Sequence, residues 1–181
     1  MTTLRITGGA LRGRRVEVPK GELRPTSERA RQAYFNIVGP RIDGARFLDL
    51  FAGSGIFSFE ALSRGASEAV AVDSGRAQTA AIARTAAAFG VAVRAVTADA
   101  LAGIKRLGGQ VFDLIYADPP YDYERYDELL TAIDREAALA PDALVAIEHR
   151  RRSEPFSAEL RRLRFHRRAD YGEIWISFFI A

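Results

Sequence analysis

The chain has 181 residues, 48% apolar and 27% charged, which is the size and composition of one compact folded domain and excludes a disordered or low-complexity protein. Its net charge is only +3. Its longest uncharged stretch (residues 50–59) is too short to cross a bilayer, and its start lacks the apolar core of a secretory signal. We therefore expect a cytoplasmic protein. The absence of cysteine excludes disulfides, thiolate zinc sites and cysteine nucleophiles, and with these the usual chemistry for methylating a pyrimidine at ring carbon 5.

The first predicted elements form a small extension ahead of the main sheet. Residues 4–7 and 14–18 are predicted as two short strands joined through a glycine-containing turn. Residues 27–38 carry apolar side chains at helical spacing, and Thr26 or Ser27 is a suitable N-cap, so this segment is predicted as a helix. Because a segment of about 45 residues is too small for a core of its own, we expect residues 1–45 to pack on a larger domain, residues 46–181.

From residue 46 onward, short apolar runs alternate with helical stretches, which is typical of a parallel α/β sheet. Two later strand-like runs flank an Asp-Tyr-Gly turn and predict a closing antiparallel hairpin. The expected fold is therefore α/β, a mostly parallel seven-stranded sheet with a C-terminal antiparallel hairpin and a small N-terminal β-hairpin plus helix extension. Strands are predicted at residues 46–51, 68–73, 91–97, 111–117, 143–148, 163–169 and 173–180, and helices at residues 55–64, 75–89, 99–107 and 123–138.

The first strand of the main domain runs into a glycine turn, Asp49-Leu-Phe-Ala-Gly-Ser-Gly55, and then into a helix. Gly53 and Gly55 allow a sharp bend and let a ligand approach the N-terminus of that helix. Asp73 ends the next strand, 18 residues after Gly55, where a carboxylate can accept hydrogen bonds from both hydroxyls of a ribose. Together these residues predict an adenosine-containing cofactor.

The sequence favours S-adenosylmethionine within that class. A dinucleotide fingerprint needs a small residue three positions after Gly55, but Ser58 there follows two bulky residues, and Asp49 would repel a pyrophosphate. S-adenosylmethionine has no phosphate and carries two cationic groups, which suits the net charge of −6 of residues 47–147. Asp99 can accept from the adenine amino group, or it can cap the helix that follows it. The residues predicted to bind the cofactor are Asp49, Phe51, Ala52, Gly53, Gly55, Asp73, Ser74, Asp99, Ala100 and Asp118.

The most specific string is Asp118-Pro119-Pro120-Tyr121, directly after the predicted strand 111–117. In a doubly wound sheet this strand lies beside the one that leads into the glycine turn, so both turns should face one crevice. The prolines fix the turn and leave its carbonyls free, so Asp118 and the Pro119 carbonyl can accept both N–H groups of an exocyclic amine. Tyr121 can stack on the base that carries this amine. We predict these four residues as the catalytic site.

These motifs resemble those of the amino-methyltransferases that modify exocyclic nitrogens of nucleobases. The resemblance implies a Rossmann-like S-adenosylmethionine-dependent methyltransferase fold, and methyl transfer to N2 of a guanine in 16S ribosomal RNA. The chain departs from the family pattern at Ile56, Phe57 and Phe59, where the family has small residues or leucine. The resemblance narrows to the RsmD-type bacterial 16S rRNA (guanine-N2)-methyltransferases through Arg5-Ile-Thr-Gly-Gly9, Arg12-Gly-Arg-Arg15, Arg24-Pro-Thr-Ser-Glu-Arg29, Phe35-Asn36 and Glu60-Ala-Leu-Ser-Arg-Gly-Ala66.

Positive charge gathers at the start of the chain, which agrees with an RNA partner. Residues 1–46 hold ten basic and four acidic side chains, and 24 of the 26 basic residues of the chain are arginine, which binds phosphate through a two-pronged contact. The resemblance implies 16S rRNA as the partner, within an assembling or assembled small subunit, and we expect the protein to act as a monomer. Each of these arginines could instead be a solvated surface residue. The predicted RNA-binding residues are Arg5, Arg12, Arg14, Arg15, Arg24 and Arg29, with Arg31 as a further candidate.

Other hypotheses stay open at this point. The same turn could serve an enzyme that methylates adenine N6 or a DNA base, the glycine turn could serve a nicotinamide-dependent oxidoreductase, and the chain could be an RNA-binding module without activity. His149 and His166 lie in arginine-rich tracts without metal-ligand spacing, so we expect both at the surface and no metal site. The run Arg150 to Arg152 either contacts RNA or forms a solvated loop.

Overall fold

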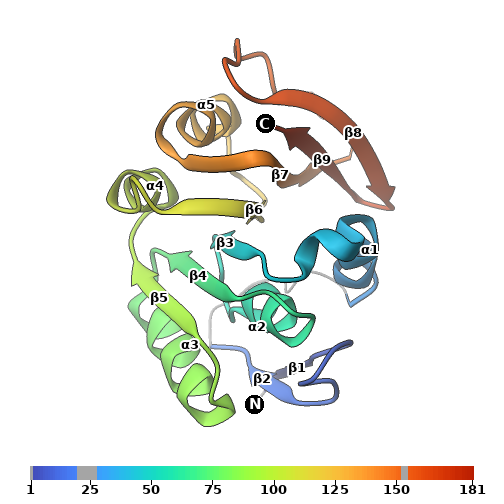
Figure 1. The fold of residues 1–181 in the computed structure, drawn as a ribbon, viewed down its shortest axis with the longest axis vertical. Helices are drawn as coiled ribbons and strands as arrows, with labels where there is room; N and C mark the ends of the chain where they lie inside the picture. The colour runs from blue at the N-terminus through green and yellow to red at the C-terminus, as the bar shows by residue number, and fades with distance from the viewer. Residues whose placement is uncertain (1, 20–27, 152–154) are drawn as a thin grey trace.

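The computed structural model describes residues 2–19, 28–151 and 155–181 (Figure 1). Seven strands form one sheet in the order β5-β4-β3-β6-β7-β9-β8. The first five of these run parallel, whereas β9 pairs antiparallel with both β7 and β8. This confirms the predicted mostly parallel sheet with a C-terminal antiparallel hairpin. The strands are β3 (Arg46–Leu50), β4 (Glu68–Asp73), β5 (Val93–Thr97), β6 (Val111–Ala117), β7 (Ala138–Arg150), β8 (Arg164–Tyr171) and β9 (Ile174–Ile180).

Helices cover both faces of the sheet. Phe47 of β3 packs in an apolar cluster with residues of α1, α2 and α3, whereas the next residue, Leu48, packs in a second cluster with residues of α4 and α5. Successive side chains of a strand point to opposite faces, so each cluster fills one side of the sheet. In the ranges described, none of the helices has the length and apolarity needed to cross a bilayer. The helices are α1 (Glu28–Val38), the 3-10 helix η1 (Gly39–Ile42), α2 (Ile56–Ser63), α3 (Arg76–Phe89), α4 (Ala100–Arg106) and α5 (Tyr126–Glu136).

The strand order reverses between β3 and β6. From β3 the chain proceeds outward through β4 to β5, and then returns to β6 on the other side of β3. Leu50 of β3 is level with Ala117 of β6, and the backbone N–H of Asp118 donates to the carbonyl of Leu50 (3.3 Å). The glycine turn and the Asp118 turn therefore lie side by side at the carboxyl ends of these strands, as the sequence predicts. Sheets of this kind bind ligands at this position.

Strand β7 is the element that differs most from its prediction. It begins at Ala138, ahead of the predicted start at residue 143, and it passes through Asp142, whose φ is 59°. A register shift between Phe112 and Leu114 of β6 accommodates the extra residues, so pairing continues on both sides of the irregularity. The turn-forming character of the sequence around Asp142 thus marks a bulge within the strand and not its start.

The N-terminal segment forms a small sheet of its own that lies beside α2 (Figure 1). The backbone N–H of Ala10 donates to the carbonyl of Ser63, the last residue of α2, at 2.7 Å. The predicted N-cap residues of α1, Thr26 and Ser27, lie outside the described residues. The two strands are antiparallel and shorter than predicted: β1 (Thr3–Arg5) and β2 (Arg15–Glu17).

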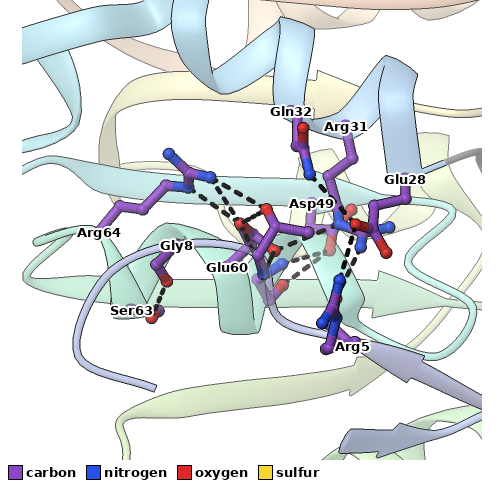
Figure 2. Close-up of polar contacts among 11 residues, drawn as sticks. Arg5, Gly8, Glu28, Arg31, Gln32, Asp49, Glu60, Ser63 and Arg64 are labelled. Atoms are coloured by element: carbon purple, nitrogen blue, oxygen red, sulfur yellow. Dashed lines mark hydrogen bonds and ion pairs between the residues drawn. The ribbon is translucent and has the colours of Figure 1, made fainter. Parts of the chain in front are cut away.

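Glu60 of α2 is fully buried and links the N-terminal segment and α1 to α2 (Figure 2). Its carboxylate accepts from Arg31 Nε (3.3 Å), from Arg64 Nη2 (2.8 Å) and from the backbone N–H of Thr7 (3.0 Å). Arg31 is fully buried as well, and it also donates to the carbonyl of Arg5 (2.8 Å). The prediction of Arg31 as an RNA-binding candidate is therefore wrong, because a buried carboxylate draws its guanidinium into the interior.

Candidate active site

The glycine turn between β3 and α2 has a fixed and strained backbone. Phe51, Gly53 and Gly55 have φ values of 62°, 53° and 75°. This left-handed region is unfavourable for a residue such as Phe51, and such strain concentrates at functional sites. A Cβ at Gly55 would lie 2.8 Å from Cγ1 of Ile82 in α3, so close packing as well as φ requires glycine there.

Asp73, at the carboxyl end of β4, holds the glycine turn in place. One carboxylate oxygen accepts from the N–H of Gly53 and the other from the N–H of Gly75, both at 2.8 Å. Ala52 is attached to the same strand, since its N–H donates to the carbonyl of Val72 (3.0 Å). A carboxylate oxygen can accept more than one hydrogen bond. Asp73 can therefore fix the turn and still accept from a ribose hydroxyl.

Ser54, between the two glycines of the turn, supplies a test of whether the site fits a cofactor. Within the described part of the chain, its hydroxyl is buried and has no hydrogen-bond partner. Buried hydroxyl groups are nearly always hydrogen-bonded, so such an exception needs an explanation. A ligand with polar groups at the turn, such as the amino-acid part of S-adenosylmethionine, would supply the missing partner. The residues present thus fit this cofactor.

Asp49 of β3 is buried directly beneath the turn and caps α2. One of its carboxylate oxygens accepts from the backbone N–H (3.1 Å) and the hydroxyl (2.8 Å) of Ser58. Burial, together with the smaller effects of the charges of Asp118 and Asp73, raises the pKa of Asp49 to about 7 despite these hydrogen bonds. Asp49 thus interacts with Asp118 in one turn and with Asp73 beside the other, and we call these three carboxyl groups the acidic cluster. A cationic ligand would relieve their repulsion.

The remaining predicted cofactor-binding residues, Ser74, Asp99 and Ala100, follow β4 and β5, which are neighbours in the sheet. Asp99 is exposed and caps α4, because its Oδ1 accepts from the backbone N–H of Leu101 at 3.0 Å. The structure thus shows the N-cap role of Asp99, and a contact with adenine would have to use its remaining lone pairs. Ala100 is buried in the first turn of α4, and Ser74 is exposed beside Asp73.

Asp118 has a carboxyl neighbour that the sequence analysis did not identify. Glu148 of β7 is only 8% exposed, hydrogen-bonds to Asp118, and accepts from the hydroxyl of Tyr116 at 2.8 Å. Burial is the main reason, and the charge of Asp118 the second, that the pKa of Glu148 is raised to about 9. The sequence feature that could have identified Glu148 is its place as an acidic residue at the end of the predicted strand 143–148, at the same edge of the sheet as Asp118.

The rest of the Asp118 turn presents an aromatic ring to the solvent. Pro119 is buried and Pro120 is exposed, whereas the side chain of Tyr121 is 55% exposed, which is rare for so large an apolar ring. The guanidinium carbon of Arg150 lies 3.7 Å from the centre of this ring. The face of the Tyr121 ring is thus open to a partner group, as it would have to be for a nucleobase to stack on it.

Aromatic contacts join the two turns directly. The ring of Phe51, in the glycine turn, meets the ring of Tyr123, two residues beyond Tyr121, edge to face with centres 5.2 Å apart. The predicted cofactor residues and catalytic residues are thus brought together at one rim.

A separate groove of about 660 Å³ lies between α3 and β5 and is lined by Arg76, Thr79, Ala80, Ala83, Ala95, Thr97 and Arg106.

The two histidines differ from each other in the structure. His149 is 2% exposed, with Nε2 hydrogen-bonded to the hydroxyl of Ser177 (2.8 Å) and its ring packed edge-on against Phe156. The prediction of a surface position is therefore wrong for His149, because the rings of Tyr126, Phe156 and Trp175 pack around it. His166 is exposed, as predicted. Among the described residues, no group of three or more His, Cys, Asp or Glu side chains is arranged so that it could hold a metal ion.

Five of the six predicted RNA-binding arginines are described, and all five are exposed. Arg5 pairs with Glu28 (3.4 Å) and Arg14 lies over the ring of Phe89 (5.0 Å). Such exposed contacts contribute little free energy, so they do not prevent a guanidinium from moving to a phosphate. Arg24 lies outside the described residues, and the exposed five are Arg5, Arg12, Arg14, Arg15 and Arg29.

Comparisons with known proteins cover nearly the whole chain. The family model described as "Conserved hypothetical protein 95" matches residues 4–180. The chain is 36% identical to the "Putative rRNA methyltransferase YlbH" of Bacillus subtilis (strain 168), over 83% of this chain and 85% of that protein. It is 34% identical to the "Ribosomal RNA small subunit methyltransferase D" of Escherichia coli (strain K12), over 80% of this chain and 74% of that protein.

Solved structures share the fold. The "Putative methyltransferase yhhF from Escherichia coli" superposes with a TM-score of 0.86 at 29% identity, covering 99% of this chain and 98% of that one. An RNA methyltransferase from Salinibacter ruber, solved in complex with S-adenosyl-L-homocysteine, superposes with a TM-score of 0.64 over 87% of this chain and 93% of that one. At 15% identity, the second likeness concerns the fold alone.

Proposed function

This chain belongs to the family described as "Conserved hypothetical protein 95", the RsmD family, and from this we propose that it is a methyltransferase of 16S ribosomal RNA. It transfers the methyl group of S-adenosylmethionine to the exocyclic N2 of a guanine in the small ribosomal subunit. One observation carries the proposal: the strained glycine turn after β3 and the Asp118 turn after β6 lie side by side, on adjacent parallel strands.

S-adenosylmethionine supplies an electrophilic methyl carbon on a positively charged sulfur. The residues that would hold it are Asp73 at the ribose, Ser54 at the polar end, and Asp99 near the adenine. The acidic cluster favours a ligand with cationic groups over a phosphate-containing one. We therefore expect S-adenosylhomocysteine to stabilise the protein in a thermal-shift measurement, whereas NAD leaves its melting temperature unchanged; stabilisation by NAD alone would contradict this choice of cofactor.

The Asp118 turn makes the amine of the base reactive by accepting hydrogen bonds from its two N–H groups. An exocyclic amine is a poor nucleophile because its lone pair is conjugated with the base. Two acceptors, the Asp118 carboxylate and the Pro119 carbonyl, favour the pyramidal geometry in which the lone pair is free to attack. Tyr121 stacks on the base once the base has left its own stack. The proton released after methylation passes to water or to Asp118.

The N-terminal segment supplies the RNA contacts in this proposal. Residues 1–45 form the RNA-binding extension and residues 46–181 the methyltransferase domain, and the protein acts as a monomer. The five exposed arginines of the extension, together with Arg24, contact phosphates of the 16S rRNA. The exposed side chains and the excess positive charge of residues 1–46 support this assignment.

The experiment that tests the proposal uses the purified protein with isotopically labelled S-adenosylmethionine. The substrates are small subunits that lack the modification and, in parallel, naked 16S rRNA and DNA. Digestion to nucleosides and mass spectrometry identify the product. We expect label in N2-methylguanosine from the subunits. Label in methyladenosine, or in DNA alone, would refute the guanine-N2 proposal.

A further inference from the structure

Glu148 lies in contact with Asp118, but the reaction proposed above does not use it. β7 and β6 are parallel neighbours with Ile147 level with Ala117, so Glu148 and Asp118 follow at the same height in the sheet. Glu148 hydrogen-bonds to Asp118 and accepts from the hydroxyl of Tyr116 (2.8 Å). Tyr116 is itself fully buried and stacked on Phe57, with ring centres 3.8 Å apart. Glu148 thus occupies a fixed position.

A hydrogen bond between two carboxyl groups requires a proton on one of them. Two adjacent carboxylates cannot both ionise at neutral pH without strong repulsion, so the pair holds one proton. Asp118 is half-buried, whereas Glu148 is almost fully buried. A charge is better solvated at the more exposed group, so the proton resides on Glu148, in agreement with the raised pKa of that residue.

The buried tyrosines around the pair and Asp49 have pKa values outside this range. Burial raises the pKa of Tyr126 on α5 to about 12, and it raises the pKa values of Tyr116 and Tyr34 above their ordinary value, so these phenols remain neutral. Asp49 has a pKa of about 7, below that of the pair. Arg150 follows His149 in β7, and His149 hydrogen-bonds to Ser177 on β9. A transition near pH 9 therefore belongs to Glu148 and Asp118.

We propose that Glu148 is a positioning residue for methyl transfer: as a neutral carboxylic acid it donates a hydrogen bond to Asp118 and keeps Asp118 ionised and correctly oriented to accept from the amine. This inference rests on the proposed function, since it gives Glu148 a task only if Asp118 receives an amine. A protonated Asp118 would present an O–H group to the amine and lose one of its acceptor positions.

Two substitutions separate this role from simple packing. Glu148→Leu removes the donor, and we expect kcat to fall by about 10²-fold, the loss typical of a displaced reacting group. Glu148→Gln keeps both contacts, because its amide N–H can donate to Asp118 while its carbonyl accepts from Tyr116, so it should recover most of the lost kcat. Glu136→Gln, at the exposed end of α5, is the matched control and should behave as wild type. Wild-type kcat in Glu148→Leu would overturn the proposal.

The pH profile gives a readout that packing alone would not change. In the wild type, kcat should fall above about pH 9, roughly tenfold per pH unit, as the pair loses its proton. Glutamine cannot lose a proton in this range, so the profile of Glu148→Gln should stay flat there. An identical alkaline limb in both proteins would contradict the inference.

Infrared spectroscopy tests the shared proton without any substrate. The difference spectrum between wild type and Glu148→Gln at pH 7 should contain the carbonyl stretch of a protonated carboxylic acid, and this band should vanish at alkaline pH. Its absence at pH 7 would refute the inference, even if Glu148→Leu fails to fold. If the methylated product were on a base other than guanine, the proposed function would fail, whereas this band and the pH profile would still decide the role of Glu148.

Discussion

Asp118 is the side chain on which the proposed chemistry depends most. It follows β6 in a half-buried turn, so its loss should remove an acceptor without opening a cavity in the core. We expect Asp118→Ala to lower kcat by roughly 10²- to 10³-fold, the range measured when one preorganised hydrogen-bonding partner is removed from an active site. Steady-state kinetics and far-UV circular dichroism check this prediction. Turnover at the wild-type rate in a folded variant would exclude Asp118 from the reaction.

Asp49 gives the stability of the protein a characteristic pH dependence. Its native pKa of about 7 exceeds the ordinary value of 3.8, so between these pH values the native state binds a proton that the unfolded state has lost. The free energy of unfolding should therefore fall as pH rises from about 4 to about 7, by at most about 1.4 kcal/mol per pH unit. In Asp49→Asn, which keeps an acceptor for Ser58, this contribution should disappear.

Urea titrations of wild type and Asp49→Asn at several pH values measure that difference directly. Glu148 contributes a slope of the same sign, but it is present in both proteins and cancels in the comparison. Equal slopes in the two proteins between pH 4 and pH 7 would show that Asp49 is ionised throughout this range. The measurement needs neither cofactor nor RNA.

We predict that Arg150 holds the ring of Tyr121 in position to stack on the base. Its guanidinium lies 3.7 Å from the ring centre, within the range of a cation–π contact, which at an exposed site is worth about 0.5–1 kcal/mol. We expect Arg150→Ala to raise the KM for the RNA substrate about two- to fivefold with little change in melting temperature. The KM of Arg150→Lys, which keeps the charge but not the planar group, should lie between those of the wild type and Arg150→Ala. An unchanged KM in Arg150→Ala would argue against this role.

At the scale of elements, the attachment of the N-terminal hairpin to α2 depends on Gly9. It has a φ of +76°, and a Cβ there would lie 1.7 Å from the carbonyl oxygen of Ser63. Gly13 in the same hairpin has a φ of +88°, but no atom lies within 4 Å of its hypothetical Cβ. The two positions thus share backbone strain and differ only in steric clash.

We therefore predict that Gly9→Ala destabilises the protein by about 1–3 kcal/mol more than Gly13→Ala, the usual cost of overpacking. Because the clash displaces the arginine-bearing hairpin from α2, Gly9→Ala should also weaken RNA binding more than Gly13→Ala does. Thermal unfolding and filter-binding titrations measure both effects. If the two variants were equally stable, the hairpin would not be anchored through this contact.

The strands and helices were largely predictable because each has a local cause. Both faces of the sheet are buried, so β3, β4 and β6 appear in the sequence as short, mostly apolar runs, and each is followed by a turn signal. The first residue of β7 was not predictable, because the bulge around Asp142 contains residues that in other sequences end a strand. Whether such residues interrupt pairing depends on the neighbouring strand, which the local sequence does not contain.

At the scale of the whole molecule, the two turns of the site were predictable from topology. A doubly wound sheet brings the ends of β3 and β6 together whatever the intervening sequence. The burial of Arg31 and the contact of Glu148 with Asp118 were not predictable from topology. Arg31 is buried because Glu60 lies opposite it, and Glu148 acquires a partner because β7 joins β6 in one register. Both depend on side chains that meet only after folding.

The central claim is that the glycine turn and the Asp118 turn form a single site. The most direct test is an experimental structure of the protein with bound S-adenosylhomocysteine. We predict that the ligand lies against residues 51–55, with its ribose beside Asp73 and its sulfur facing the Asp118 turn. A ligand bound elsewhere, for example in the groove between α3 and β5 that Arg76 and Arg106 line, would contradict this account.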